Sequence, residues 1–190
     1  MNESFQQNST PMNCAVFIAT SLDGFIARKN GDLDWLDKAS EQVSEDEDTG
    51  YYKFLDTIDA IIMGSNTFSK VLSFGIDWPY EKEVIVLSKS MNSVPSTLPN
   101  TVSLSSESPA ELCIRLEANG YKRLYVDGGS LIQSFLQKKL IDEITITTIP
   151  VLLGSGIPLF RDFTADIHLQ LKDSKAYNFG FVQTTYRVVY

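Results

Sequence analysis

Metal-binding residues are scarce in this sequence, which has one histidine and two cysteines among 190 residues. His168 stands alone, and Cys14 and Cys113 each lie within an apolar pattern, so no Cys/His cluster of the kind that holds zinc is present. We therefore predict no metal site and two buried free thiols. The lack of a second histidine and of a G-x-S-x-G turn also argues against a serine hydrolase.

Basic charge and long apolar runs are also scarce. Sixteen basic residues stand against 24 acidic ones, and this net charge of -8 would repel nucleic acid, so we expect no nucleic-acid partner. No apolar run is long enough for a membrane helix, and the polar N-terminus lacks the features of a secretory signal. We predict a cytoplasmic protein with a flexible extension over residues 1–12 and one domain over residues 13–190.

The rest of the chain alternates apolar runs with helical patterns, which predicts an α/β fold. The expected sheet is single, mixed and mostly parallel, with helices on both faces and an antiparallel hairpin at the C-terminus. Residues 21–36 are predicted to be a long loop with a short extended piece at Phe25–Ile26. Strands are predicted at 14–20, 59–64, 83–88, 101–105, 122–129 and 142–153, helices from Ser44, behind Gly64, over 108–120 and from Ser130, and the hairpin within 166–190.

Three predicted strand ends carry polar and glycine residues, and ligands of open α/β sheets bind at such ends. Gly64 to Thr67 leads directly into a helix, and this start is equally compatible with a phosphate site and with a plain N-cap. Ser88 to Ser90 fits a second phosphate contact or a solvated turn. Asp127 to Ser130 fits a turn with positive φ or a close approach by a pyrophosphate. The usual glycine-rich nucleotide fingerprints are absent, so a nucleotide site here would have another design.

The helix predicted from Ser44 carries the acid–base candidate. Ser44 and Glu47 fit a capping box, which leaves Asp48 as a carboxylate on the apolar face of that helix. Such a group could orient or protonate a nitrogen heterocycle, or could simply complement the helix dipole, and the pattern alone favours the second role. The glycine-rich stretch 152–160 is expected to be a loop that lines the site.

Five motifs in a fixed order resemble the dihydrofolate reductase fold: "FIATSLDGFIA", "IIMGSNTF", "VIVLSKS", "LYVDGGSLIQSFL" and "TTIPVLLGSGIPLF". The resemblance is strongest to the family named for the C-terminal reductase domain of riboflavin biosynthesis, and it spans about Asn13 to Tyr190. It implies an oxidoreductase that uses NADPH and transfers hydride to a C=N or C=O bond of a small pterin- or pyrimidine-like substrate. Homodimers are common in this family, so a homodimer is a further expectation.

The resemblance also implies roles for particular residues. Asp48 lies sixteen positions before Gly64, where dihydrofolate reductases have their substrate-binding carboxylate, and Trp35 and Tyr52 are expected beside the substrate. The nicotinamide would lie near Ala19 and Ile26, the phosphate at Gly64, Ser65, Asn66 and Thr67, the adenosine 2′-phosphate near Ser88 and Lys89, and the pyrophosphate at Gly128, Gly129, Ser130 and Leu131.

Two departures from the family pattern limit these expectations. Ser65 stands where an arginine usually contacts the 2′-phosphate, so the choice between NADPH and NADH stays open, although Lys89 or Lys70 could compensate. The chain also lacks the zinc deaminase domain of the bifunctional riboflavin enzymes. A nucleotide-binding protein that keeps the fold without catalysis is the alternative function, and true dihydrofolate reductase activity is a less favoured third.

Overall fold

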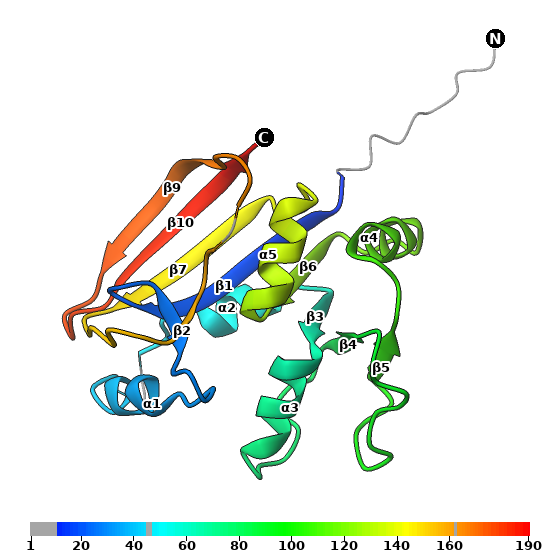
Figure 1. Cartoon of the computed structure of the whole chain (residues 1–190), viewed down its shortest axis with the longest axis horizontal. Coiled ribbons are helices and arrows are strands. Elements are labelled where there is room, and N and C mark those ends of the chain that lie inside the picture. The colour runs from blue at the N-terminus through cyan, green and yellow to red at the C-terminus, as the bar shows by residue number, and fades with distance from the viewer. Residues whose placement is uncertain (1–10, 45–46, 162) are drawn as a thin grey trace.

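The structure, a computed structural model, describes residues 11–44, 47–161 and 163–190. Eight strands form one sheet in the order β5-β4-β3-β6-β1-β7-β10-β9, and β2 pairs with β8 in a small second sheet (Figure 1). The strands are β1 (Asn13–Ser21), β2 (Phe25–Ala27), β3 (Ala60–Gly64), β4 (Glu83–Leu87), β5 (Val102–Ser105), β6 (Arg123–Asp127), β7 (Glu143–Ile149), β8 (Ile157–Pro158), β9 (His168–Ala176) and β10 (Val182–Val189). The helices are α1 (Asp34–Ser40), α2 (Tyr51–Asp56), α3 (Ser65–Ser73), α4 (Pro109–Ala118) and α5 (Gly129–Gln137).

The strands from β5 to β7 are all parallel, whereas β10 runs antiparallel to β7 and β9 runs antiparallel to β10. The longest parallel pairing joins β1 to β7, from Ala15 opposite Glu143 to Ser21 opposite Ile149. The predicted mixed, mostly parallel sheet with an antiparallel C-terminal hairpin is therefore confirmed.

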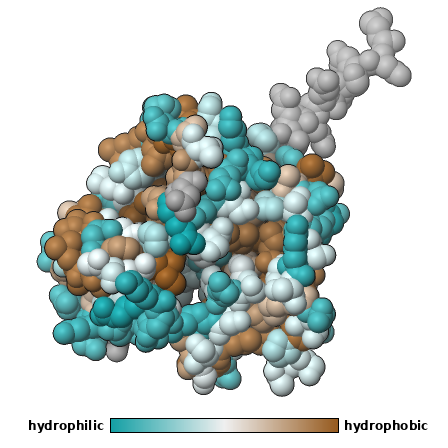
Figure 2. Space-filling model, in the orientation of Figure 1, coloured by the Kyte–Doolittle hydropathy of each residue, from teal (hydrophilic) through white to brown (hydrophobic). Residues whose placement is uncertain are grey.

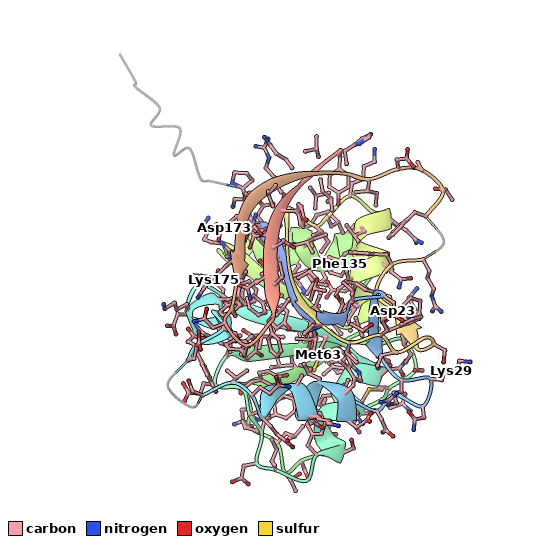
Figure 3. All side chains as sticks on the ribbon, turned by 90° about the vertical axis from the view of Figure 1, so that its left-hand side faces the viewer. Asp23, Lys29, Met63, Phe135, Asp173 and Lys175 are labelled. Atoms are coloured by element: carbon pink, nitrogen blue, oxygen red, sulfur yellow. The ribbon has the colours of Figure 1, made fainter. Side chains whose placement is uncertain are left out.

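The central strands are buried on both faces, as their continuous apolar sequences predicted. Residues 60–63 of β3 have no exposed surface, and they alternate between two cores. Ile62 packs with Phe135 of α5 on one face, while Met63 packs with Phe54 of α2 on the other. Figure 3 shows Met63 and Phe135 inside the molecule, and Figure 1 shows α5 in front of the sheet and α2 behind it. Helices therefore cover both faces, as expected.

The helix predicted over 108–120 begins and ends close to its expected bounds. The Ser108 side chain accepts a hydrogen bond from the backbone N–H of Glu111, and the Glu111 side chain accepts one from the backbone N–H of Ser108. This reciprocal capping box satisfies two of the unpaired donors at the helix start. Cys113 of α4 lies against Cys14 of β1 with 3.8 Å between the two sulfur atoms, and both cysteines are buried and free as predicted.

The helix predicted from Ser44 is wrong in its start, because α2 begins only at Tyr51. The backbone N–H of Glu47 donates to the carbonyl oxygen of Ser44 at 2.9 Å, so the predicted capping box does not form. Gly50 has a φ of 90°, which ends any continuous helix through this segment, and its N–H donates to Asp48 Oδ1 at 2.8 Å. Residues 45–46 of the predicted helix lie outside the described residues.

Helix α1 was not predicted: its first three residues fall in the predicted loop 21–36, and its remaining residues, 37–40, were assigned no element. It has seven residues and no side-chain cap, so its sequence carries little local helix signal. Trp35 and Ala39, four residues apart on one face, are buried against Ile149 of β7 and Phe181 of the C-terminal hairpin. Contacts with residues distant in sequence therefore stabilise this helix, and a sequence pattern could not predict them.

In the part of the chain that the structure covers, no helix is long and apolar enough to cross a membrane. The predicted flexible extension falls mostly on residues 1–10, which lie outside that part. The first strand begins at Asn13, where the sequence predicted the start of the domain.

Candidate functional site

A large cavity opens at the carboxyl ends of the parallel strands, where the strand-end residues predicted a site. Its volume is about 1310 Å³, compared with roughly 300–1,000 Å³ for a typical small-molecule site. The surface is hollowed between the part that carries α1 and the part that carries α3 (Figure 2). A cavity of this size can hold two ligands side by side.

Most of the predicted site residues line this cavity together. They are Ala19, Ile26, Asp48, Tyr52, Gly64, Ser65, Asn66, Thr67, Gly128, Gly129, Ser130 and Leu131. Ile157 from the 152–160 stretch also lines the cavity, as predicted, although this stretch forms the short strand β8 within its loop. Trp35, Ser88 and Lys89 are not among the lining residues.

One side of the cavity, the helix-start wall, consists of Gly64–Thr67 and Gly128–Leu131 at the beginnings of α3 and α5. Neither helix has a side-chain hydrogen bond at its N-cap, in contrast to the complete capping box of α4. Both N-cap residues are glycines, Gly64 and Gly128, so the first backbone N–H groups of α3 and α5 have no side-chain partner at the cap. The two helix starts lie at the neighbouring strands β3 and β6, and the phosphate contacts predicted for them stay predictions.

Gly128 and Gly129 of the helix-start wall allow other residues of the protein to approach closely. Gly128 has a φ of 101°, and a Cβ atom there would lie 2.2 Å from Thr67 Oγ1. A Cβ atom at Gly129 would lie 2.6 Å from Ile26 Cδ1. The predicted turn with positive φ is confirmed at Gly128, and the close approach at this turn is made by side chains from α3 and β2.

Ser88 and Lys89 lie just beyond the cavity, since Leu87 before them is a lining residue. Ser88 is buried, and its hydroxyl oxygen accepts the backbone N–H groups of Ser90 and Met91, each at 3.3 Å. The hydroxyl therefore stabilises a turn, and the phosphate contacts predicted for Ser88 and Lys89 stay predictions.

Trp35 is buried behind the cavity lining and does not face into the cavity. Its neighbours Leu33 and Leu36 line the cavity, while Trp35 packs with Tyr177 and Phe181. This packing supports the part of the wall that α1 contributes. The predicted substrate contact of Trp35 stays a prediction.

Another part of the cavity lining, the acidic wall, consists of Glu47, Asp48, Thr49, Tyr51, Tyr52, Tyr80, Tyr125 and Asp127, and Asp127 directly precedes Gly128 of the helix-start wall. The C-terminal hairpin holds the 47–52 segment in place. Gln183 Nε2 donates to the carbonyl oxygen of Thr49 and to Thr147 Oγ1, each at 2.9 Å. The Tyr177 hydroxyl donates to the same Thr49 carbonyl oxygen at 3.1 Å. Asp48, half-buried in this segment, is thus positioned from residues more than a hundred positions away.

Asp127, the last residue of β6, is the acidic group that the sequence interpretation did not select. Burial beside Tyr51, Tyr80 and Tyr125 raises the pKa of its carboxyl group to about 6. Burial also raises the pKa of Tyr51 to about 12, and the negative charge of Asp127 adds to that shift. A strand-end acid two residues after Tyr125, and so on the same face of the sheet, was the available signal.

Asp23 at the end of β1 has a different role. Its Oδ1 accepts the Ser21 hydroxyl at 2.6 Å, and its Oδ2 accepts the backbone N–H of Gly154 at 2.7 Å. These hydrogen bonds, that of Ser21 foremost, hold the pKa of the Asp23 carboxyl group below its usual value. These hydrogen bonds join the loop after β1 to the loop after β7, and Asp23, which is exposed, is not among the residues that line the cavity.

The sheet order, the crossover helices and the cavity at the strand ends define a protein of the dihydrofolate reductase-like fold class. The chain belongs to the RibD C-terminal domain family, whose sequence profile matches residues 14–182. The expected family and fold are therefore confirmed.

Relatives support this assignment. The chain is 35% identical over 164 residues to the uncharacterized protein YwjB of Bacillus subtilis, a match that covers 85% of this chain and 90% of YwjB. A Shewanella sp. PV-4 protein, provisionally named a riboflavin biosynthesis protein, is 42% identical with a TM-score of 0.89, and the match covers 94% of this chain and 100% of that one.

A more distant structure shares the fold. It is the Thermotoga maritima diaminohydroxyphosphoribosylaminopyrimidine deaminase/5-amino-6-(5-phosphoribosylamino)uracil reductase, with 16% identity and a TM-score of 0.65. The match covers 94% of this chain but only 57% of the Thermotoga chain. This chain is thus similar to one part of a larger protein.

Proposed function

We propose that this chain is a nicotinamide-dependent reductase that transfers hydride to a C=N or C=O bond of a small pyrimidine- or pterin-like heterocycle. One observation carries the proposal: the helix-start wall and the acidic wall face the same cavity. The first wall suits the phosphates of a dinucleotide, and the second offers carboxyl groups beside them. Membership of a family named for a riboflavin biosynthesis reductase domain supports the same class of reaction.

The residues present fit a nicotinamide dinucleotide. The starts of α3 and α5 offer backbone N–H groups without side-chain caps, and Ala19 and Ile26 provide apolar surface for a nicotinamide ring. The bound cofactor would supply the hydride, while the chain would hold and orient it. Because Ser65 offers no positive charge to a 2′-phosphate, we expect NADPH to bind less than about tenfold more tightly than NADH.

The two acids of the site suit different tasks. Asp127, with a pKa of about 6, retains a proton in part of the molecules near neutral pH, so it can donate to the nitrogen or oxygen of the reduced bond. The hydride then goes to carbon and the proton to the heteroatom. Asp48 would accept an N–H group from the edge of a heterocycle, the role that its family position implied.

Calorimetric titration of the full chain with NADPH and with NADH tests the cofactor part of this proposal. We expect binding in the micromolar range, followed by loss of nicotinamide absorbance when a pterin or pyrimidine substrate is added. No binding at millimolar cofactor would overturn the proposal. Binding without any oxidation across such substrates would favour the non-catalytic nucleotide-binding protein.

We also propose that the chain forms a homodimer. The edge strand β9 carries exposed Leu169 and Leu171 and offers unpaired backbone groups to a second copy. Analytical ultracentrifugation over a range of concentrations tests this, and a monomer throughout would contradict it.

A further inference from the structure

The acidic wall presents three carboxyl groups to the cavity. Glu47 is exposed, Asp48 is half-buried, and Asp127 is enclosed by tyrosine side chains. An ionised carboxylate accepts hydrogen bonds and cannot donate them, so this wall suits a ligand that carries N–H donors. Its negative charge also attracts cations and repels anions.

Aromatic side chains give the same wall flat apolar surfaces. The Tyr51 ring lies 5.6 Å from the Phe17 ring and 6.0 Å from the Tyr52 ring, measured between centroids. All three residues line the cavity. Such rings favour a flat aromatic or heteroaromatic ligand, which can stack against them or pack edge to face.

The basic residues of the cavity lie away from the acidic wall. Among the lining residues that the structure describes, the basic ones are Lys29 and Lys70. Lys70 Nζ lies 3.4 Å from Asp32 Oδ1, so its charge is already matched in part. Lys29 is exposed and lies at the periphery of the molecule in Figure 3. The residues outside the described ranges include no lysine or arginine, as the sequence shows.

Two further lysines lie near the 47–52 segment but do not line the cavity. Lys53 follows Tyr52 and is exposed. Lys175 is on β9, and its ammonium group lies 4.1 Å from the centroid of the Tyr177 ring. The acidic wall therefore contains carboxyl and phenol groups and, within the described part of the chain, no positive charge.

A phosphate ester would be poorly matched to such a wall. Proteins bind phosphate through charge-assisted hydrogen bonds from arginine, lysine or helix starts. Here the proposed cofactor takes the two helix starts, those of α3 and α5. A phosphate on the second ligand would then face Glu47, Asp48 and Asp127 without a cation to offset them.

We propose that the substrate is a flat heterocycle without a phosphate group, neutral or cationic, whose N–H donors meet Asp48. This inference rests on the proposed reductase function and names its substrate class. It separates this chain from the Thermotoga enzyme of the same fold, which is named for a phosphoribosyl substrate.

Matched ligand pairs test the proposal on the full chain saturated with NADPH. One pair is 5-amino-6-ribosylaminouracil and its 5′-phosphate, and the other is 6-hydroxymethylpterin and its phosphate ester. We expect calorimetry to show at least about tenfold tighter binding of the unphosphorylated member. Equal or tighter binding of the phosphate ester would overturn the proposal, as would no binding of any of the four ligands to the cofactor-bound protein.

A charge change on the wall sharpens the test. Glu47→Lys places a cation at the acidic wall. It should therefore reduce, by at least about threefold, the ratio of the two dissociation constants within each ligand pair. Glu41→Lys makes the same change of charge at an exposed residue that does not line the cavity, so it should leave the ratio of dissociation constants within each pair unaltered. Equal effects of the two variants would contradict the proposal. Failure to bind either NADPH or NADH would instead overturn the reductase function, so the two failures are distinguishable.

Discussion

The two walls of the cavity differ in how the chain builds them. Each half of the helix-start wall is a strand end, a glycine and the first turn of a helix, all contiguous in sequence. The acidic wall joins residues 47–52 to the end of β6 and depends on a hydrogen bond between Gln183 and Thr49, which are 134 positions apart. Locally encoded features thus make each half of the proposed cofactor wall, while contacts between residues distant in sequence hold the proposed substrate wall together.

This difference predicts that substitutions in the two walls will impair different properties of the protein. Substitutions in the helix-start wall should disturb both the fold and cofactor binding, because Gly128 packs directly against Thr67. Substitutions in the acidic wall should leave cofactor binding intact and impair the use of the substrate. The following predictions test that separation, beginning with the largest expected effect.

Asp127→Asn should give the largest loss of activity. The amide cannot transfer a proton, so we expect kcat/KM to fall by about 10²–10⁴-fold while the Kd of NADPH stays within a factor of about two. Steady-state rates and calorimetry measure the two quantities. Asp173→Asn changes an exposed acid on the edge strand β9 (Figure 3) and should have no effect. An Asp127→Asn enzyme with full activity would remove this residue from the mechanism.

Asp48→Asn should have the next largest effect on activity. Loss of a charge-assisted hydrogen bond to the substrate costs about 1.5–3 kcal/mol, so kcat/KM should fall by about 10–100-fold. The fold should persist, because the amide oxygen can still accept the Gly50 N–H bond. Unchanged turnover of a substrate by this variant would show that Asp48 is not a functional acid.

Gly128→Ala, unlike the two aspartate substitutions, should reduce both the stability of the fold and the affinity for the cofactor. The added Cβ atom would lie 2.2 Å from Thr67 Oγ1 in a backbone with a φ of 101°. We expect a loss of about 2–4 kcal/mol in the free energy of unfolding and at least tenfold weaker NADPH binding.

Gly154→Ala provides the matched control for this steric effect. Gly154 also has a positive φ, 70°, but nothing lies within 4 Å of its Cβ position. Its substitution should therefore cost only the backbone strain, about 1–2 kcal/mol, and leave NADPH binding unchanged. Equal losses from the two substitutions in denaturant unfolding would mean that the contact with Thr67 is unimportant.

Gln183→Ala should affect the acidic wall at a distance. Among the residues that the structure describes, removal of the amide leaves the Thr49 carbonyl oxygen with the Tyr177 hydroxyl as its one side-chain donor, so the segment that carries Asp48 should loosen. We expect KM for the substrate to rise by about tenfold with kcat changed less, and the Kd of NADPH to stay constant. Thr184→Ala, at the next position of β10, is the control, and an equal rise in KM there would argue against a positioning role.

The smallest expected effect is on the pH dependence of stability. Burial raises the folded-state pKa of Asp127 to about 6, above its value in the unfolded chain. The folded protein therefore binds this proton more tightly, and the wild type loses stability relative to Asp127→Asn as pH rises through about 6. The amount by which the Tm of Asp127→Asn exceeds that of the wild type should grow by a few degrees between about pH 4 and pH 7. A constant difference over this range would show that the carboxyl group is not perturbed.

Much of the fold and of the helix-start wall could be predicted because their signals are local. Continuous apolar runs marked the central strands, and Gly64 and Gly128 marked the turns from strand to helix. The capping box of Ser108 and Glu111 formed, whereas the similar pattern at Ser44 and Glu47 did not. The pattern alone could not separate these cases, because distant side chains bind the Thr49 carbonyl oxygen and hold residues 48–50 outside a helix.

The sequence by itself determined the family, the α/β alternation and the places where strands meet helices, since hydrophobic periodicity and glycine act within a few residues. Only the tertiary structure decided which acidic side chains line the cavity and how the pKa of Asp127 is shifted. Asp48 depends on the C-terminal hairpin, and Asp127 depends on tyrosine side chains from three separate segments. The physical reason is that burial and electrostatic environment are set by everything that packs around a group, and most of that surrounding lies far away in the sequence.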